Sequence, residues 1–258
     1  MNRALVVALV ALVGLIVVGR VRTLLTAEEV EPPAPAQVTG AASPARVAPA
    51  RTAPPVVESR TPAVDLLARL EARRVLLRSG KRTYLDSLFA ETDSVIRRWP
   101  EQDGVPLTVA VLPTGDASAD ARVRRILTRA LAVWERVQAG ISFTMAADSA
   151  GAVILVQVAD TLDGERAGQT DLRWTRDGSI HAATITLVLK TAKGEPVPDE
   201  GLFAVTSHEV GHALGLPHSG DERDVLFSTT QTGQPTERDQ ATLRLLYQLP
   251  PGSIRERP

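Results

Sequence analysis

The stretch HEVGHALGLPH, residues 208–218, constrains the fold more than any other part of this 258-residue chain. It holds three of the four histidines. His208 and His212 are four positions apart, so on an α-helix they lie about 40° apart around the axis and roughly 6 Å apart along it. Both imidazoles then face one point, while an apolar back that includes Phe203 and Val210 would pack against a sheet. The stretch predicts a helix with one face in the core and the other on a cleft.

The same stretch predicts where this helix ends. Gly215 adopts positive φ at low cost, and the proline after Leu216 pushes that leucine to an extended conformation. The chain would then bring His218 to the histidine pair as a third nitrogen. Three neutral imidazoles with one open position are a ligand set of catalytic zinc. Glu209 flanks the pair, and we expect it to act as general base for a zinc-activated water and then to protonate the leaving amine.

These residues carry a resemblance to a known family. HEVGHALGLPH matches H-E-x-x-H-x-x-G-x-x-H, the zinc motif of the metzincin metallopeptidases, and Ser219 after it resembles the matrixin branch. The similarity extends over residues 104–250. It implies an α+β fold: a twisted mixed sheet with one antiparallel edge strand, an active-site helix and a C-terminal helix. It also places the edge strand at residues 181–189, where an extended substrate would add to the sheet.

Three features depart from the family pattern. Leu226 stands where the family has a methionine in the tight turn beneath the zinc, and its similar volume predicts a modest effect. The chain has no cysteine, which excludes latency through a propeptide thiolate. Animal matrixins carry a structural zinc with several histidines, whereas only His181 lies near the matching strand here. Loop carboxylates such as Asp177 are interpreted as solvated turns. The sequence supports one catalytic Zn2+ and supports neither structural Zn2+ nor Ca2+.

Hydrophobic periodicity predicts the elements of the matrixin-like region. Strands are expected at VPLTVAVLP, ISFTMAA and AVILVQVAD, followed by a hairpin within QTDLRWTRDGSIHAATITLVL. A helix with one apolar stripe is expected over residues 117–140. The metal-binding helix should begin near Asp199. The last helix should begin at Thr236, with Asp239 completing its N-terminal cap.

The N-terminus indicates export. An apolar run over residues 4–19 follows Arg3 and precedes Arg20 and Arg22. A helix of about 16 residues spans roughly 24 Å, and snorkelling arginines would fit it to a hydrocarbon core of roughly 30 Å. Residues 1–22 are interpreted as a signal-anchor, with a cleaved signal peptide as the alternative. In either case the catalytic domain would lie outside the cytoplasm, either anchored to the membrane or secreted.

Two segments separate this N-terminus from the matrixin-like region. Residues 23–62 hold eight of the 18 prolines, a composition that favours a disordered linker. Residues 63–103 show apolar positions at three- and four-residue steps, broken at Ser79-Gly80. They are interpreted as a helical stalk or cap on the catalytic domain, and a propeptide that covers the active site is the alternative. Residues 251–258 form a short tail.

Composition narrows the function. The net charge of −1 argues against nucleic acid as a partner, and the absence of cysteine excludes a cysteine nucleophile. The sequence therefore predicts a zinc-dependent endopeptidase that acts on exported proteins or peptides and contacts a membrane through residues 4–19. The alternative is a non-catalytic, zinc-containing peptide-binding module of the cell envelope. No pattern indicates the oligomeric state.

Overall fold

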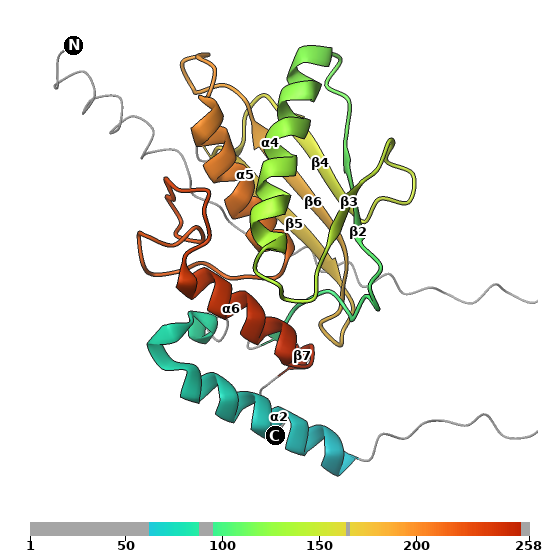
Figure 1. The fold of residues 1–258 in the computed structure, drawn as a ribbon, viewed down its shortest axis with the longest axis vertical. Helices are drawn as coiled ribbons and strands as arrows, with labels where there is room; N and C mark the ends of the chain where they lie inside the picture. Colours follow the sequence, from blue (N-terminus) through green and yellow to red (C-terminus); the bar gives the residue numbers. More distant parts are fainter. Residues whose placement is uncertain (1–61, 88–94, 164–165, 254–258) are drawn as a thin grey trace, which may run out of the picture.

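The structure is a computed structural model that describes residues 62–87, 95–163 and 166–253. The elements are β2 (Leu107–Val111), α4 (Ala117–Glu135), β3 (Phe143–Met145), β4 (Ile154–Ala159), β5 (Gly168–Trp174), β6 (Ile180–Val188), α5 (Asp199–Ala213) and α6 (Glu237–Gln248), preceded by α2 (Pro62–Ser79). Five strands form one sheet, and helices α4 and α5 pack on it. In the view of Figure 1, helix α6 lies below the sheet and helix α2 lies below α6. The predicted α+β fold class is confirmed.

The sheet is mixed, with strand order β3-β2-β4-β6-β5. Every neighbouring pair is parallel except β5, which runs antiparallel to β6 at the edge. The prediction that residues 181–189 form this edge is wrong, because residues 181–188 belong to β6, which pairs with β4 on one side and β5 on the other. The burial patterns show the difference. Alternate residues are buried at the start of β5, whereas Ile185 to Val188 of β6 are all buried, as in strands covered on both faces.

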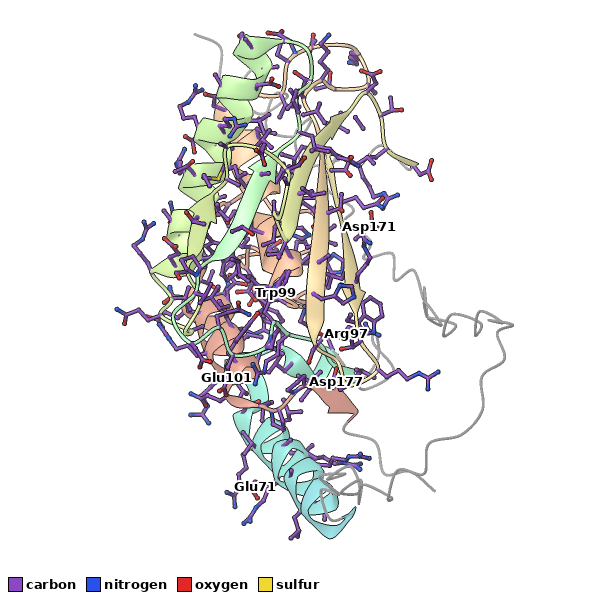
Figure 2. All side chains as sticks on the ribbon, turned by 90° about the vertical axis from the view of Figure 1, so that its right-hand side faces the viewer. Glu71, Arg97, Trp99, Glu101, Asp171 and Asp177 are labelled. Atoms are coloured by element: carbon purple, nitrogen blue, oxygen red, sulfur yellow. The ribbon has the colours of Figure 1, made fainter. Side chains whose placement is uncertain are left out.

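Helices α4 and α5 lie on the same side of the strands, as Figure 2 shows. Asp116 caps α4 by accepting hydrogen bonds from the backbone N–H groups of Ser118 and Ala119, at 2.8 and 3.2 Å. The predicted apolar stripe of α4 is buried, including Leu127 and Trp134. The indole of Trp134 donates to the carbonyl of Ser207 at 2.8 Å, which joins α4 to the middle of α5.

Helix α5 is buried along most of its length. Every residue from Leu202 to Ala213 is buried, on the histidine side as well as on the apolar side, and the cleft expected at the histidine face stays a prediction. The burial arises because the structure packs α5 against α4 on one side and against β5 and β6 on another. The exposed start of α5 is joined to α4 by ion pairs, among them Arg129 with Glu200 at 2.6 Å.

The N-terminal part differs from its prediction in the second half. Helix α2 ends at Ser79, at the predicted break, and Gly80 has φ +50. Within residues 80–87, two 3-10 turns (Gly80–Arg82 and Leu85–Ser87) follow it. Ile96 lies in strand β1 (Val95–Ile96), which pairs with β7 (Gly252–Ser253). Tyr84, Leu85 and Trp99 are buried in the same core as the sheet and its helices.

Several predictions on domain organisation fall outside the described residues. The signal-anchor of residues 1–22, its apolar run 4–19, and the linker up to residue 61 lie there. No helix formed by the described residues is long and apolar enough to cross a membrane. The boundaries predicted for the stalk or cap, the catalytic domain and the tail stay predictions.

Candidate metal centre

Helix α5 ends in a Schellman motif that turns the chain toward the site. The N–H of Leu216 donates to the carbonyl of Gly211 at 3.1 Å, and the N–H of Gly215 donates to that of His212 at 2.9 Å. Gly215 has φ +93, and a Cβ there would lie 2.2 Å from the carbonyl oxygen of Arg97. Both the conformation and the lack of space therefore require glycine.

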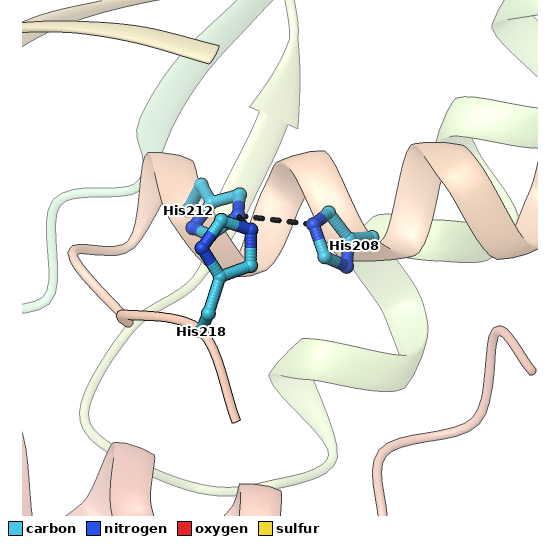
Figure 3. Close-up of side chains that lie close together, drawn as sticks. All are labelled: His208, His212 and His218. Carbon is cyan, nitrogen blue, oxygen red and sulfur yellow. Dashed lines mark hydrogen bonds between the residues drawn. The ribbon is translucent and has the colours of Figure 1, made fainter. Parts of the chain in front are cut away.

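The three histidines of the motif converge after this turn (Figure 3). The Nε2 atom of His212 lies 3.0 Å from that of His208 and 3.3 Å from that of His218. His208 and His212 are buried, and His218 is partly exposed. Among the described residues, this is the one group of three or more histidines or carboxylates that could hold a metal ion.

Backbone carbonyls determine how two of the rings face. Nδ1 of His208 lies 2.7 Å from the carbonyl of Val225, and Nδ1 of His212 lies 2.8 Å from that of Leu216. A carbonyl oxygen only accepts, so each Nδ1 carries the proton and each Nε2 keeps its lone pair. Burial lowers the pKa of His208 to about 3 and that of His212 well below its usual value, so both rings are neutral near pH 7.

This donor set fits zinc. The 3.0 Å contact drawn between His208 and His212 in Figure 3 joins two nitrogens that carry no proton, so two acceptors face each other. A cation between them removes that conflict. Two imidazole nitrogens at the usual distance of about 2.0–2.1 Å from a tetrahedral zinc lie about 3.3 Å apart, close to the separations found here.

Glu209 lies beside the histidines and against the edge strand. It is fully buried, and its Oε2 accepts a hydrogen bond from the hydroxyl of Thr170 at 2.7 Å. Its Oε1 has no hydrogen-bond partner among the residues that the structure describes. Burial raises the pKa of Glu209 to about 8, although the Thr170 hydrogen bond and the Arg166 charge oppose this. A Cβ on Gly168 would lie 2.6 Å from Oε1, so β5 passes directly against the carboxyl group.

Leu226 lies beneath the site, in the turn where the sequence placed it. It is fully buried, and its Cδ2 would lie 2.7 Å from a Cβ on Gly211, the residue just before His212. Its carbonyl accepts a hydrogen bond from the N–H of Ser219 at 2.8 Å. The leucine side chain therefore fills the space under α5, and the main chain around it holds the loop that follows His218.

Two of the remaining sequence candidates lie apart from this site. His181 is exposed on β6. Asp177 accepts hydrogen bonds from the hydroxyl of Thr175 and the N–H of Ser179, and so closes the hairpin turn between β5 and β6.

Sequence reasoning missed several residues of the site. No sequence pattern marks the carbonyl groups of Val225 and Leu216, because every residue has a backbone carbonyl. Thr170 could have been considered only after β5 was identified as the strand beside Glu209. Tyr84, which is described below, lies within residues 63–103, which the sequence predicts to be a helical stalk or cap.

Comparison with known proteins agrees with this geometry. The family model for matrixin matches residues 98–248, more than half of the chain. The chain belongs to the matrixin family of zinc metalloendopeptidases. A search of curated proteins found no match. Membership of a peptidase family implies that its substrates are proteins or peptides.

Proposed function

We propose that this protein is a zinc-dependent endopeptidase of exported proteins, with His208, His212 and His218 as the ligands of one catalytic zinc and Glu209 as general base. One observation carries the proposal. The Nε2 atoms of His208 and His218 lie 3.0 and 3.3 Å from that of His212, beside a buried carboxyl group with one oxygen that has no hydrogen-bond partner among the described residues.

The residues have separate tasks in this reaction. Bound zinc supplies Lewis acidity, which acidifies water and polarises a carbonyl group. The carbonyls of Val225 and Leu216 hold two of the rings in the tautomer that presents Nε2. Thr170 holds Oε2 of Glu209, which leaves Oε1 to take a proton from the attacking water. Burial favours the protonated carboxyl group in the metal-free protein, whereas the positive charge of bound zinc would favour the carboxylate that accepts the proton. The proton then passes from Glu209 to the leaving amine.

The edge strand supports a peptide substrate. No strand of the described residues pairs with the outer edge of β5, where an extended chain could add to the sheet. Gly168 and Thr170 of β5 contact Glu209. A peptide added along this strand would therefore pass the general base.

The test uses the full-length chain purified in mild detergent. Cleavage of unfolded casein and bound zinc are measured for wild type, Glu209→Gln and Glu200→Gln. The last variant is a matched control, since Glu200 lies on the same helix but is exposed and pairs with Arg129. We expect about one zinc in all three and a loss of at least about 100-fold in cleavage for Glu209→Gln alone. Zinc binding without cleavage by wild type would favour a peptide-binding module.

We infer in addition that residues 1–22 direct the chain out of the cytoplasm, with residues 4–19 as the membrane anchor. The apolar run between arginines supports this. The expected outcome is a chain that stays in the membrane pellet after an alkaline carbonate wash and is cut by protease added outside the cytoplasmic membrane. A soluble chain that lacks residues 1–22 would indicate a cleaved signal peptide. An intact soluble chain in the cytoplasm would contradict export.

A further inference from the structure

We propose that residues 83–87, which precede the matched matrixin region, form a positioning element of the metal centre, with Tyr84 as its main residue. This inference rests on the proposed zinc site. In Figure 1 the turns that follow α2 lie against the start of α6. The segment that the sequence interpreted as a stalk, a cap or a propeptide therefore contacts the half of the molecule that holds His208 and His218.

The first link joins Tyr84 to helix α6. Tyr84 is 1% exposed, and its hydroxyl donates to Oδ1 of Asp239 at 2.7 Å, across 155 positions of sequence. Its backbone N–H donates to the hydroxyl of Thr242 at 3.4 Å. Burial raises the pKa of Tyr84 well above its usual value, so the hydroxyl keeps the proton that it donates. Asp239 is also fully buried, so water does not replace this hydrogen bond.

The second link joins Asp239 to a metal ligand. Oδ2 of Asp239 accepts from the N–H groups of Val225 and Thr236, each at 2.9 Å. The carbonyl of Val225 accepts from Nδ1 of His208 at 2.7 Å. A continuous chain of hydrogen bonds therefore runs from Tyr84 through Asp239 and Val225 to the ring of His208. The position of the Val225 backbone decides where that ring points.

A second arm of the same segment reaches another ligand. The hydroxyl of Ser87 lies 2.6 Å from the carbonyl of Tyr84 and 3.1 Å from that of His218. Residues 83–87 thus hold the Val225 turn through a carboxylate and the His218 backbone through a hydroxyl. Two of the three histidines depend on one short segment that no part of the zinc motif encodes.

This geometry separates two roles for the segment. A propeptide that only covers the site can leave without harm to the metal ligands, and its loosening raises activity. A positioning element cannot leave without harm to the metal ligands. Its loss leaves Oδ1 of the buried Asp239 without its hydrogen-bond donor and allows the Val225 turn to move. Outer partners of metal ligands typically change metal affinity by about 10–100-fold when they are removed.

The test compares Tyr84→Phe with wild type in the full-length, zinc-loaded protein. Zinc affinity is measured by competition with a chromophoric chelator, and the visible spectrum is recorded after exchange of zinc for Co2+. Tyr247→Phe is the matched control, because it also removes one tyrosine hydroxyl, which bonds the carbonyl of Leu214 at 3.0 Å and has no bond to Asp239. We expect zinc affinity to fall at least about tenfold and the Co2+ bands to shift for Tyr84→Phe only.

Ser87→Ala provides an independent measurement if Tyr84→Phe folds poorly, and we expect a decrease of several-fold in zinc affinity. The inference is wrong if both variants keep wild-type zinc affinity and Co2+ spectra within twofold, or if they gain activity with unchanged zinc affinity. A wild-type chain that binds no zinc would contradict the proposed function together with this inference. A chain that binds zinc but cuts nothing contradicts only the catalysis, and the zinc affinities still decide the inference.

Discussion

The chain before Gly215 and the chain between α5 and α6 both supply the metal centre, but they are held in place differently. The first part consists of strands and helices around an apolar core, with side chains such as Leu127 and Ile185 fully buried. The second part contains no helix or strand beyond one isolated bridge between Ser219 and Phe227. Its order comes from the buried side chains of Val225 and Leu226 and from hydrogen bonds to a few polar side chains.

Two buried carboxylates organise this second part. Asp224 accepts from the hydroxyl of Thr236 at 2.6 Å and from the guanidinium of Arg238 at 2.9 Å. Asp239 accepts from Val225 and Thr236. The apolar part therefore sets the place of α5 and of His208 and His212 on it, whereas the polar part sets the direction of the His208 ring. Substitutions in either part should lower the free energy of unfolding, but only those in the polar part should also lower the affinity for zinc.

The largest effect is expected for Asp239→Ala. The substitution leaves the buried N–H of Val225, the partly buried N–H of Thr236 and the buried hydroxyl of Tyr84 without their acceptor. At about 1–3 kcal/mol for each unsatisfied group, partly relieved by relaxation, the free energy of unfolding should fall by about 3–5 kcal/mol. Urea unfolding in the presence of EDTA measures it, and a chelator titration measures the accompanying loss of zinc affinity.

Leu127→Ala is the control for that experiment. Leu127 is fully buried on α4, and removal of its side chain should cost about 2–5 kcal/mol. Zinc affinity of the folded fraction should stay within twofold of wild type, because no hydrogen bond to a histidine changes. Equal losses of zinc affinity in the two variants would show that the two parts of the molecule do not differ in this way.

Glu209→Gln should stabilise the metal-free protein at alkaline pH. Burial raises the pKa of Glu209 to about 8 from 4.5. As pH rises through this window the unfolded carboxyl group ionises while the folded one stays protonated, so wild type loses stability. Glutamine does not ionise, and the variant should be more stable on the order of 3 kcal/mol at pH 8. Thermal unfolding in EDTA at pH 5 and pH 8 checks this, and a gain of the same size at both pH values would contradict it.

Gly215→Ala should destabilise the protein by about 2–3 kcal/mol. The new Cβ would lie 2.2 Å from the carbonyl oxygen of Arg97, at a backbone with φ +93. The Schellman motif would have to open, and Leu216, whose carbonyl orients His212, would move with it. Gly194→Ala is the control, because that glycine also has positive φ, at +78, but no atom lies within 4 Å of its Cβ position. A cost no larger than that of the control would contradict the steric argument.

The smallest effect is expected for Leu226→Met, which restores the residue of the family pattern. The two side chains have similar volumes, and Leu226 is fully buried. Stability should change by less than about 1.5 kcal/mol and zinc affinity by less than about threefold. Calorimetry and the chelator titration measure both. A larger change would mean that the thioether has a role beyond filling space.

The fold could be predicted wherever buried residues recur at the regular spacing of a helix or where a capping motif marks a helix end. The stripe of α4, the start of α5 and the Thr236–Asp239 cap of α6 were all readable from residue spacing, and the structure confirms them. The edge strand was not, because both strands of the hairpin mix polar and apolar residues. Only pairing with β4 makes β6 the inner strand.

The site, like the fold, has parts that the sequence predicts and parts that it does not. Helical spacing brings His208 and His212 together, and Gly215 returns the chain to them, so the motif alone locates the histidines. The groups that aim the rings are backbone carbonyls, which carry no sequence information. The contact of Tyr84 with Asp239 spans 155 positions. The sequence predicts Asp239 only as a helix cap. It does not distinguish an aspartate that caps a helix from a buried aspartate that also connects three segments of the chain.

Gly211 has no side chain, and this leaves room for Leu226, which is 15 positions later in the sequence. Its Cβ would lie 2.7 Å from Leu226 and 3.0 Å from Trp134, so bulk on the helix and bulk in the turn compete for one volume. Positions 211 and 226 should therefore covary during evolution: an alanine at 211 would be accepted only after the residue at 226 becomes smaller. In directed evolution of this scaffold, the pair should be randomised together, because each position sets what the other can accept.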